Sequence, residues 1–223
     1  MTLKEENAER LQAMEDIKFS HIFHNLSTAN HCRRVHMAAK AFKKAGGHDV
    51  RIAAMAHDWG KIETFDPAGG EPGNNWFRGH EKKSAEILYN LGGHPMDVGL
   101  VREHGSVRQV EQMKAQTALK VLRRIYEGSE PVVTLGKFMT LLECDAMSFS
   151  DEGRRLSRDQ SFLFCLKALW AIDHWSDGWA FEQKFVFGDR SPEGPLGLHP
   201  NHIKLTRKWL AINKLISLSI HDI

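Results

Sequence analysis

Residues 50–61 read VRIAAMAHDWGK, the most apolar helical segment of the chain, and His57 and Asp58 interrupt it. Asp49 can cap this segment, so we predict a helix over 50–59 that is apolar almost all round and belongs at the centre of a bundle. Burying an ionised carboxylate there is very unfavourable unless a cation or several hydrogen-bond donors meet it. His57 and Asp58 are therefore either a satisfied structural pair at the end of their helix or part of a buried site.

Helical patterns continue on both sides of this segment. Caps and apolar spacings of three and four residues predict further helices, over about 2–17, 29–45, 80–91, 96–104, 107–126, 131–149, 157–173 and 199–218. Residues 63–79, rich in Gly, Pro and Asn, form a long loop of the kind that is more often functional than idle. No internal repeat or clean linker divides the chain. We therefore expect one all-α domain over 1–223, with its core at about 29–149 and a C-terminal helical extension of unknown role over 150–223.

The composition excludes several classes of protein. Hydrophobic residues make up 42% and charged residues 26% of the chain, with Gly 18 and Pro 7, so it is neither collagenous nor largely disordered. No apolar run is long enough to span a bilayer, and the charged first residues lack the apolar core of a secretory signal. Three cysteines without a CxxC pair favour the reducing cytoplasm. A net charge of +2 without a long like-charged block does not indicate a protein that coats nucleic acid.

Histidine is the unusual feature of the composition, because the chain has 13 of them and several fall on predicted inward faces. His31 shares a helical stripe with Val35, Ala38 and Phe42. The same reasoning, applied to the other helices, directs six polar groups toward one core: His31, His57, Asp58, His80, His104 and Asp145. Any one of them alone would more often be a core residue with a backbone partner. Six together need a shared partner, and a metal cluster is the simplest one.

The chemistry of these side chains narrows the choice of metal. Imidazole and carboxylate ligands without thiolate suit divalent Mn, Fe, Co, Ni or Zn in open, water-bearing coordination. Six candidate ligands exceed the needs of one structural site. A pair of ions that share a bridging carboxylate would use them all, so we expect one or two divalent transition-metal ions.

The order of these residues resembles a known signature. His31, then His57-Asp58 followed by Gly60-Lys61, then Asp145, resembles the H…HD…D pattern of the HD-domain superfamily of metal-dependent phosphohydrolases. Residues 79–87 and 100–104 are similar to the HD module of bacterial CCA-adding tRNA nucleotidyltransferases, and the whole resemblance covers about 29–149. It implies an HD-domain helical bundle around a buried metal site. It also implies the ligands of two metals: His31, His57, Asp58 and Asp145 for the first, and Asp58, as the bridge, with His80 and His104 for the second.

The resemblance implies a phosphohydrolase that acts on phosphate esters of nucleotides or nucleic-acid ends, as a phosphomonoesterase or a phosphodiesterase. A metal-bound water that loses its proton near neutral pH would attack phosphorus, with Asp58 as the central ligand. Lys61 follows Asp58 by one helical turn and could neutralise a phosphate oxygen or orient the attacking water. The structural alternative for Lys61 is a surface lysine at the end of a helix.

Three further residues are candidates for binding the substrate. Trp76 and Arg78 precede His80, where an aromatic ring could stack on a base and a guanidinium could contact phosphate. Trp76 could equally pack the loop onto the bundle. Arg34, close to His31 in the chain, is a further candidate phosphate ligand. The expected partner is a small phosphate ester or nucleotide, with nucleic acid as a second class, no membrane partner, and a cytoplasmic location.

Three other functions compete with this interpretation. HD nucleases that act on single strands share the order of the histidines and aspartates, although the chain lacks a basic stripe. Di-iron HD-domain oxygenases use a similar ligand set on O₂, but they tend to depart from the Gly60-Lys61 that follows the His-Asp pair. A metal-stabilised binding module without catalysis is disfavoured because every expected ligand is present.

Overall fold

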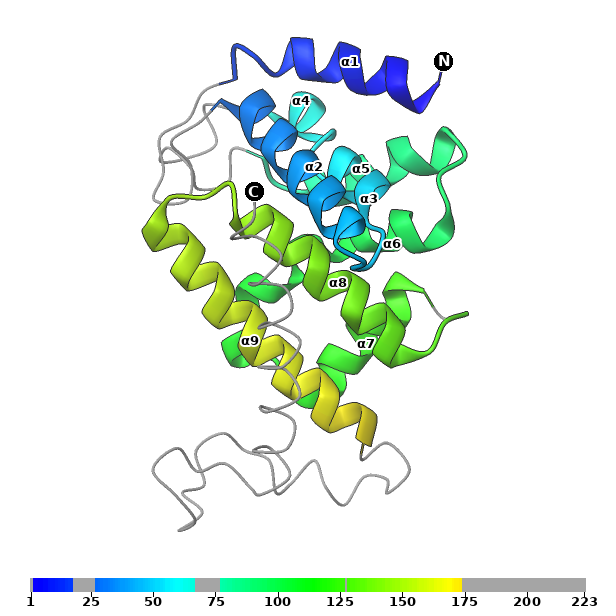
Figure 1. The fold of residues 1–223 in the computed structure, drawn as a ribbon, viewed down its shortest axis with the longest axis vertical. Coiled ribbons are helices and arrows are strands. Elements are labelled where there is room, and N and C mark those ends of the chain that lie inside the picture. Colours follow the sequence, from blue (N-terminus) through cyan, green and yellow to red (C-terminus); the bar gives the residue numbers. More distant parts are fainter. Residues whose placement is uncertain (1, 18–26, 67–76, 127, 174–223) are drawn as a thin grey trace.

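The computed structural model describes residues 2–17, 27–66, 77–126 and 128–173. Within these ranges the chain is helical and contains no strand, which confirms the predicted all-α class (Figure 1). The elements are α1 (Leu3–Ala13), α2 (Thr28–Lys44), α3 (Arg51–Ala56), α4 (Lys61–Thr64), α5 (His80–Asn90), α6 (Pro95–Glu103), the 3₁₀-helix η1 (His104–Gln112), α7 (Ala115–Ile125), α8 (Pro131–Ala146) and α9 (Asp151–Asp173). None of the helices in these ranges has the length and hydropathy needed to cross a membrane.

Local sequence signals set the beginnings of the first two helices. The side chain of Thr2 accepts a hydrogen bond from the Glu5 amide, and the Glu5 carboxylate accepts one from the Thr2 amide, which completes a capping box for α1. The hydroxyl of Ser27 accepts from the Asn30 amide at the start of α2. The sequence predicts both starts, with Thr2 to Glu5 as a capping box and Ser27-Thr28 as a cap, and the inward stripe of α2 is also where the sequence predicts it.

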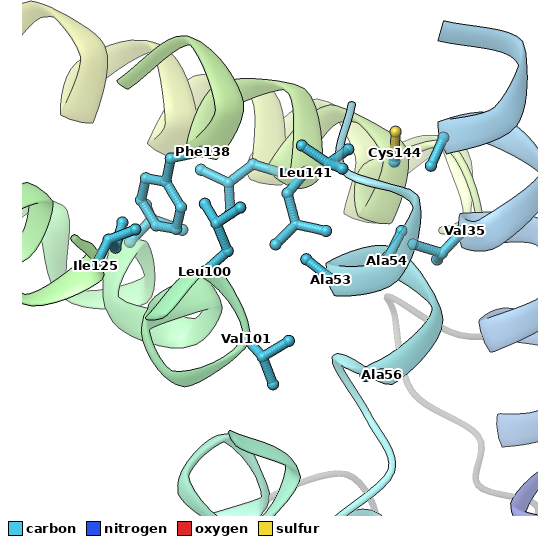
Figure 2. Packing of buried hydrophobic residues seen from close by; sticks show 14 of the residues in the cluster. Val35, Ala53, Ala54, Ala56, Leu100, Val101, Ile125, Phe138, Leu141 and Cys144 are labelled. Carbon is cyan, nitrogen blue, oxygen red and sulfur yellow. The ribbon is translucent and has the colours of Figure 1, made fainter. Parts of the chain in front are cut away.

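Apolar side chains from α2, α3, α6, α7 and α8 meet in the core of the bundle (Figure 2). The short helix α3 lies at its centre, where Ala53, Ala54 and Ala56 have no exposed surface. Because alanines occupy little space, α3 contacts α2, α5, α6 and α8 at once. Leu100 and Phe138 fill the volume beside it, and burial of each side chain contributes about 2–3 kcal/mol to stability. The central position predicted for this segment is confirmed.

The predicted end of this helix is wrong, and the difference shapes the site. We expect a helix to residue 59, whereas α3 ends at Ala56 and residues 57–60 form a turn. Bonds three residues apart replace the α-helical ones: the Trp59 amide donates to the Ala56 carbonyl, and the Lys61 amide donates to the Asp58 carbonyl. Asp58 therefore occupies a buried turn between two helices rather than the side of one helix.

The predicted helix over 107–126 is also wrong. Residues 104–112 form η1 instead, the chain extends at Lys114, and α7 begins at Ala115. The buried residues of η1 recur every third position, at His104, Val107 and Val110, which matches the three-residue turn of a 3₁₀-helix. A lysine from α9 ends η1: the buried Lys167 ammonium donates to the carbonyls of Val110, Glu111 and Met113, at 2.6, 3.3 and 2.5 Å.

Helix α1 packs across the turn that carries Asp58. The Arg10 guanidinium donates to the Trp59 carbonyl at 2.9 Å and to the Glu63 carboxylate at 2.8 Å. The indole of Trp59 is fully buried and donates to the amide oxygen of Asn7 at 3.2 Å. Residues before the predicted core at 29–149 therefore hold the turn from outside.

Helix α9 lies alongside α8 and also packs on α7 and η1 (Figure 1). Its Phe164 ring meets Phe138 of α8 at a centroid distance of 5.2 Å and an angle of 72°, an edge-to-face contact. The first part of the predicted C-terminal extension therefore shares the core of the bundle. One domain over 1–223 stays a prediction, because the predicted helix over 199–218 lies outside the described residues.

Candidate metal centre

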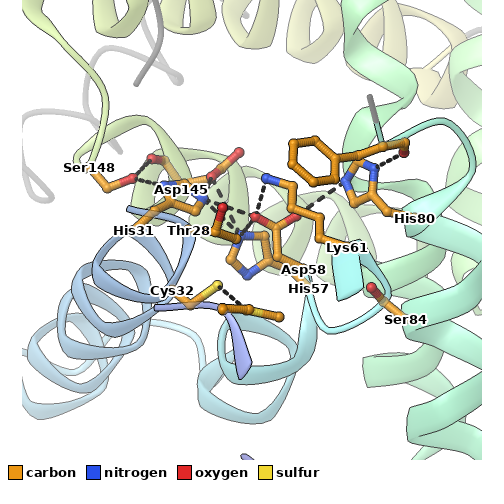
Figure 3. A network of polar contacts seen from close by, with 12 residues as sticks. Thr28, His31, Cys32, His57, Asp58, Lys61, His80, Ser84, Asp145 and Ser148 are labelled. Carbon is orange, nitrogen blue, oxygen red and sulfur yellow. Dashed lines mark hydrogen bonds and ion pairs between the residues drawn. The ribbon is translucent and has the colours of Figure 1, made fainter. Parts of the chain in front are cut away.

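Six polar groups converge between the helices at the middle of the bundle, and Figure 3 labels all of them except His104. They come from five places in the fold: His31 from α2, His57 and Asp58 from the turn after α3, His80 from the first residue of α5, His104 from the first residue of η1, and Asp145 from the last turn of α8. All are buried except Asp145, whose side chain is 15% exposed. The structure thus brings together every residue that the sequence predicts as a metal ligand.

One half of the cluster surrounds the Oδ2 atom of Asp58. The Nε2 atoms of His31 and His57 lie 3.2 and 3.3 Å from it, and 3.1 Å from each other. The Oδ1 atom of Asp145 lies 3.2 Å from His31 Nε2 and 3.7 Å from His57 Nε2. Two imidazoles and two carboxylates therefore face a common point.

The other half surrounds the second oxygen of the same carboxylate. The Oδ1 atom of Asp58 lies 3.1 Å from His80 Nε2 and 3.8 Å from His104 Nε2, and these two nitrogens are 3.3 Å apart. Asp58 thus directs one oxygen toward each pair of histidines, which is the arrangement of a bridging carboxylate.

Each histidine ring makes a hydrogen bond through Nδ1, the nitrogen that does not face Asp58, and this bond fixes the tautomer of the ring. The Nδ1 atoms of His57, His80 and His104 contact carbonyl oxygens three residues earlier in the chain, at 2.9, 2.8 and 2.7 Å. A carbonyl can only accept, so each Nδ1 carries the hydrogen and the neutral ring presents a lone pair at Nε2. His31 behaves alike, because the Ser148 hydroxyl donates to the Asp145 carbonyl at 2.8 Å and accepts from His31 Nδ1 at 2.5 Å.

With these tautomers, the Nε2 atoms of each histidine pair face each other with lone pairs. Two neutral imidazoles whose lone pairs face each other at 3.1–3.3 Å repel, and neither can donate to the other. A shared cation converts the repulsion into coordination. At metal–nitrogen distances of about 2.1 Å, neighbouring ligands on one ion lie about 3 Å apart, as these nitrogens do. The groups present therefore fit two divalent ions, with Asp58 between them.

The titration behaviour of the cluster fits the same conclusion. Burial by itself would raise the pKa of Asp58, but the charge that His57 carries when it is protonated and the charge of Lys61 hold it well below its usual range. Burial opposes ionisation of Asp145 too, but a second proton on His31, at Nε2, would donate to this carboxylate and so lowers its pKa. The carboxylates are therefore ionised near neutral pH, as metal ligands must be.

Two of the histidines differ in their titration. Burial, and the charges that His80 and His57 carry when they are protonated, lower the pKa of His104 to about 4, so its ring is neutral near pH 7. Burial also disfavours the charged form of His57, yet the Asp58 carboxylate outweighs it and raises the pKa of His57. A cation that binds at His57 therefore competes with a proton, which makes occupancy at this position dependent on pH.

A glycine explains how the turn reaches α5. A Cβ atom at Gly60 would lie 2.5 Å from the His80 carbonyl oxygen and 2.7 Å from the Ser84 amide nitrogen. The Gly60 amide donates to the Ser84 hydroxyl at 2.8 Å, which ties the turn to α5. Only a residue without a side chain can approach so closely. This contact sets the distance between Asp58 and His80.

Lys61 lies inside the cluster rather than on the surface. Only 5% of the residue is exposed, and its ammonium is 2.6 Å from Asp58 Oδ2 and 5.3 Å from the centre of the Phe77 ring. Asp58 Oδ2 makes no hydrogen bond of good geometry despite this short contact, so an ion pair describes it better. The surface alternative for Lys61 is wrong.

Sequence reasoning missed the residues that orient the ligands. Ser148 follows Asp145 by three residues, and this helical spacing could have identified it. Glu81, the neighbour of His80, places its carboxylate 3.4 Å from His80 Nδ1. The Phe149 ring stacks on His31 at 5.7 Å between centroids and 8° between planes.

The predicted substrate-binding residues are not part of this cluster. Arg34 on α2 and Arg78 before α5 are exposed, and their role stays a prediction. Trp76 lies outside the described residues.

Comparisons with known proteins identify the family. A family model described as the HD domain matches residues 28–143, more than half of the chain. The chain is also similar to the multifunctional CCA protein of Methylobacillus flagellatus, with 36% identity over 106 residues that cover 44% of this chain. The match spans about a quarter of that relative, 24% of its length. No solved structure matches the chain. The converging histidines and aspartates and the matched family model together show that this chain belongs to the HD-domain family, a superfamily of metal-dependent phosphohydrolases.

Proposed function

We propose that this protein hydrolyses phosphate esters of nucleotides or nucleic-acid ends, as a phosphomonoesterase or a phosphodiesterase. The observation that carries the proposal is the carboxylate of Asp58, which offers one oxygen to each of two pairs of histidines. Bridging carboxylates between two ions suit displacement at phosphorus, where both the attacking and the leaving oxygen need stabilisation. Similarity to a CCA protein supports nucleotides or nucleic acids as the substrate class.

The residues of the chain would divide the work as follows. His31, His57, Asp58 and Asp145 would hold one divalent transition-metal ion, and Asp58, His80 and His104 a second. Ions bound there would supply Lewis acidity, which acidifies water and neutralises phosphoryl oxygens. Asp58 would keep the two ions at a fixed separation because its backbone is held in a buried turn.

Lys61 would bind the substrate at the same place. Its ammonium points at Asp58 from a buried position and is held over the Phe77 ring. With a substrate present, this ammonium would contact a phosphoryl oxygen and stabilise the charge that develops on it. We also propose a cytoplasmic location, which the three free and buried cysteines support.

The test combines metal analysis with a panel of substrates. The full chain is stripped of metal, reloaded with Mn²⁺, Co²⁺ or Ni²⁺, and assayed on nucleoside monophosphates, cyclic phosphates and single-stranded DNA. Asp58→Ala should abolish turnover and metal binding while far-UV circular dichroism stays helical. Asp49→Asn is the matched control, because Asp49 is an exposed carboxylate paired with Arg51. Full activity of Asp58→Ala would rule out the proposed function.

A further variant tests the two halves of the cluster. His80→Ala should lower occupancy of the second ion and leave the first in place. Equal loss of both ions would instead indicate a single coupled site.

A further inference from the structure

A cavity of about 520 Å³ lies between α6 and the C-terminal ends of α5 and α7, and it shares no lining residue with the metal centre. Its size is in the range of sites that bind small organic molecules. The close crossing of α6 and α7 fixes its walls, since a Cβ atom at Gly99 would lie 1.9 Å from the Ile125 carbonyl oxygen. We call it the arginine cavity, after the lining residues Arg102, Arg123 and Arg124.

The arginine cavity is positively charged, and two of its three arginines are held in place. No acidic side chain is among the described residues that line it. Arg124 donates twice to the buried carboxylate of Glu103, at 3.0 and 2.8 Å. Arg102 donates to the Arg124 carbonyl and lies 3.4 Å from the same carboxylate. Glu103 offsets one of the three positive charges.

The guanidinium groups nevertheless remain accessible. The side chain of Arg102 is 41% exposed and that of Arg124 is 50% exposed, and Arg123 is exposed as well. Glu103 already holds two of these groups in position, so the binding of an anion costs little of the arginines' side-chain entropy. Planar guanidinium groups offer paired N–H donors that match the oxygens of a phosphate.

Two aromatic rings line the same cavity. Tyr89 at the end of α5 is 69% exposed, an unusual exposure for a side chain with so much apolar surface. Tyr126 after α7 is half-buried, and its ring lies 5.8 Å from that of His94. An exposed tyrosine beside arginines combines a flat surface for a base with donors for phosphate.

We propose that the arginine cavity is a second binding site, for the phosphate and base of a nucleotide. The arginines bind the phosphate and Tyr89 stacks on the base. The nucleotide is either free or one unit of a single-stranded nucleic acid, because both present the same chemistry. The proposal is independent of the hydrolytic function, since no residue of the metal centre takes part.

Binding is measured on the full chain by fluorescence anisotropy with two probes, a fluorescent adenosine monophosphate and a labelled single-stranded DNA of about 12 nucleotides. Tighter binding of the DNA identifies nucleic acid as the source of the ligand, and equal or tighter binding of the monophosphate identifies the free nucleotide. Either result supports the site when the variants below weaken the binding.

Arg123→Gln and Arg102→Gln should each weaken binding about tenfold. Each should also reduce the slope of log affinity against log salt concentration by the equivalent of about one phosphate contact. Tyr89→Ala should weaken binding of the nucleotide but not of inorganic phosphate. Arg51→Gln, at an exposed arginine of α3 paired with Asp49, is the control and should bind as the wild type does. Tyr89 and Arg123 are both exposed, so these two variants keep the fold even if Arg102→Gln does not.

Two results would overturn the proposal. Binding by Arg123→Gln and Tyr89→Ala equal to that of Arg51→Gln would show that the cavity takes no part. Loss of binding in Lys61→Ala, together with full binding in Arg123→Gln, would place the ligand at the metal centre instead.

Discussion

Replacing Gly60 by alanine adds a methyl group where the turn that carries Asp58 meets α5. The new Cβ atom would lie 2.5 Å from the His80 carbonyl oxygen and 2.7 Å from both Lys83 Cβ and Ser84 N. Two of these are backbone atoms and cannot rotate away. Because ordinary contacts of this kind begin near 3.4 Å, the turn and α5 must separate by about 1 Å.

The size of the effect follows from this separation. Overpacking of a buried contact costs about 1–3 kcal/mol. Loss of the 2.8 Å bond from the Gly60 amide to the Ser84 hydroxyl adds about 1 kcal/mol. A total of about 3 kcal/mol lowers the melting temperature of a chain of this size by about 6–12 °C.

The effect on metal binding is more specific than the effect on stability. Asp58 Oδ1 and His80 Nε2 are now 3.1 Å apart, and metal–ligand distances tolerate a change of only about 0.2 Å. If two ions bind as proposed, a shift of about 1 Å between the turn and α5 should therefore remove the second ion. The proposed ligands of the first ion lie on α2, the turn and α8, so that ion should remain. Elemental analysis of the loaded protein should show one ion per chain instead of two.

The glycine Gly136 in α8 provides the matched control. The nearest atoms to a Cβ there belong to the ring of His48, which is exposed and can rotate. Gly136→Ala should leave metal content unchanged, and its melting temperature should stay the same or rise because alanine favours the helix by about 1 kcal/mol. An unchanged melting temperature and two bound ions in Gly60→Ala would refute the reasoning about this contact.

Three further substitutions test how the surroundings hold the site and the fold. Ser148→Ala removes the hydroxyl that orients His31, so the affinity for Mn²⁺ should fall about 10–100-fold in a titration. Ser148→Thr keeps a hydroxyl and should retain the affinity. Equal affinities of the two variants would contradict this role of Ser148. Arg10→Leu removes the hydrogen bond to the Trp59 carbonyl, so the free energy of unfolding should fall by about 1–2 kcal/mol. Hydrogen exchange followed by mass spectrometry should show faster exchange of the α4 amides. Exchange at the wild-type rate would argue against the contact. Lys167→Met removes the ammonium that binds three carbonyls at the end of η1. The free energy of unfolding, measured in urea, should therefore fall by about 2–3 kcal/mol. An unchanged value would show that this cap is dispensable.

Helical periodicity was enough to place His31 at the site. Once α2 forms, a period of 3.6 residues puts His31 on the same face as Val35, Ala38 and Phe42, and all four are buried. Caps at Thr2 and Ser27 are equally local signals. The all-α class follows from such patterns because each depends only on residues a few positions apart.

The end of α3 and the nature of η1 could not be found in this way. Both depend on residues far away in the chain, since Ser84 accepts from the Gly60 amide and Lys167 binds the carbonyls that end η1. Locally, residues 50–59 and 107–126 have patterns that an α-helix satisfies. Contacts between elements override this preference, which is worth only a few tenths of a kcal/mol per residue.

For this protein, the sequence by itself determined which residue types gather at the core and in what order they occur along the chain. The tertiary structure decided the directions of their atoms: that Asp58 turns one oxygen toward each pair of histidines, and that Ser148 orients His31. The physical reason is that residue spacing sets the face of a helix, whereas the direction of a carboxylate or an imidazole depends on partners that only folding brings within hydrogen-bond distance.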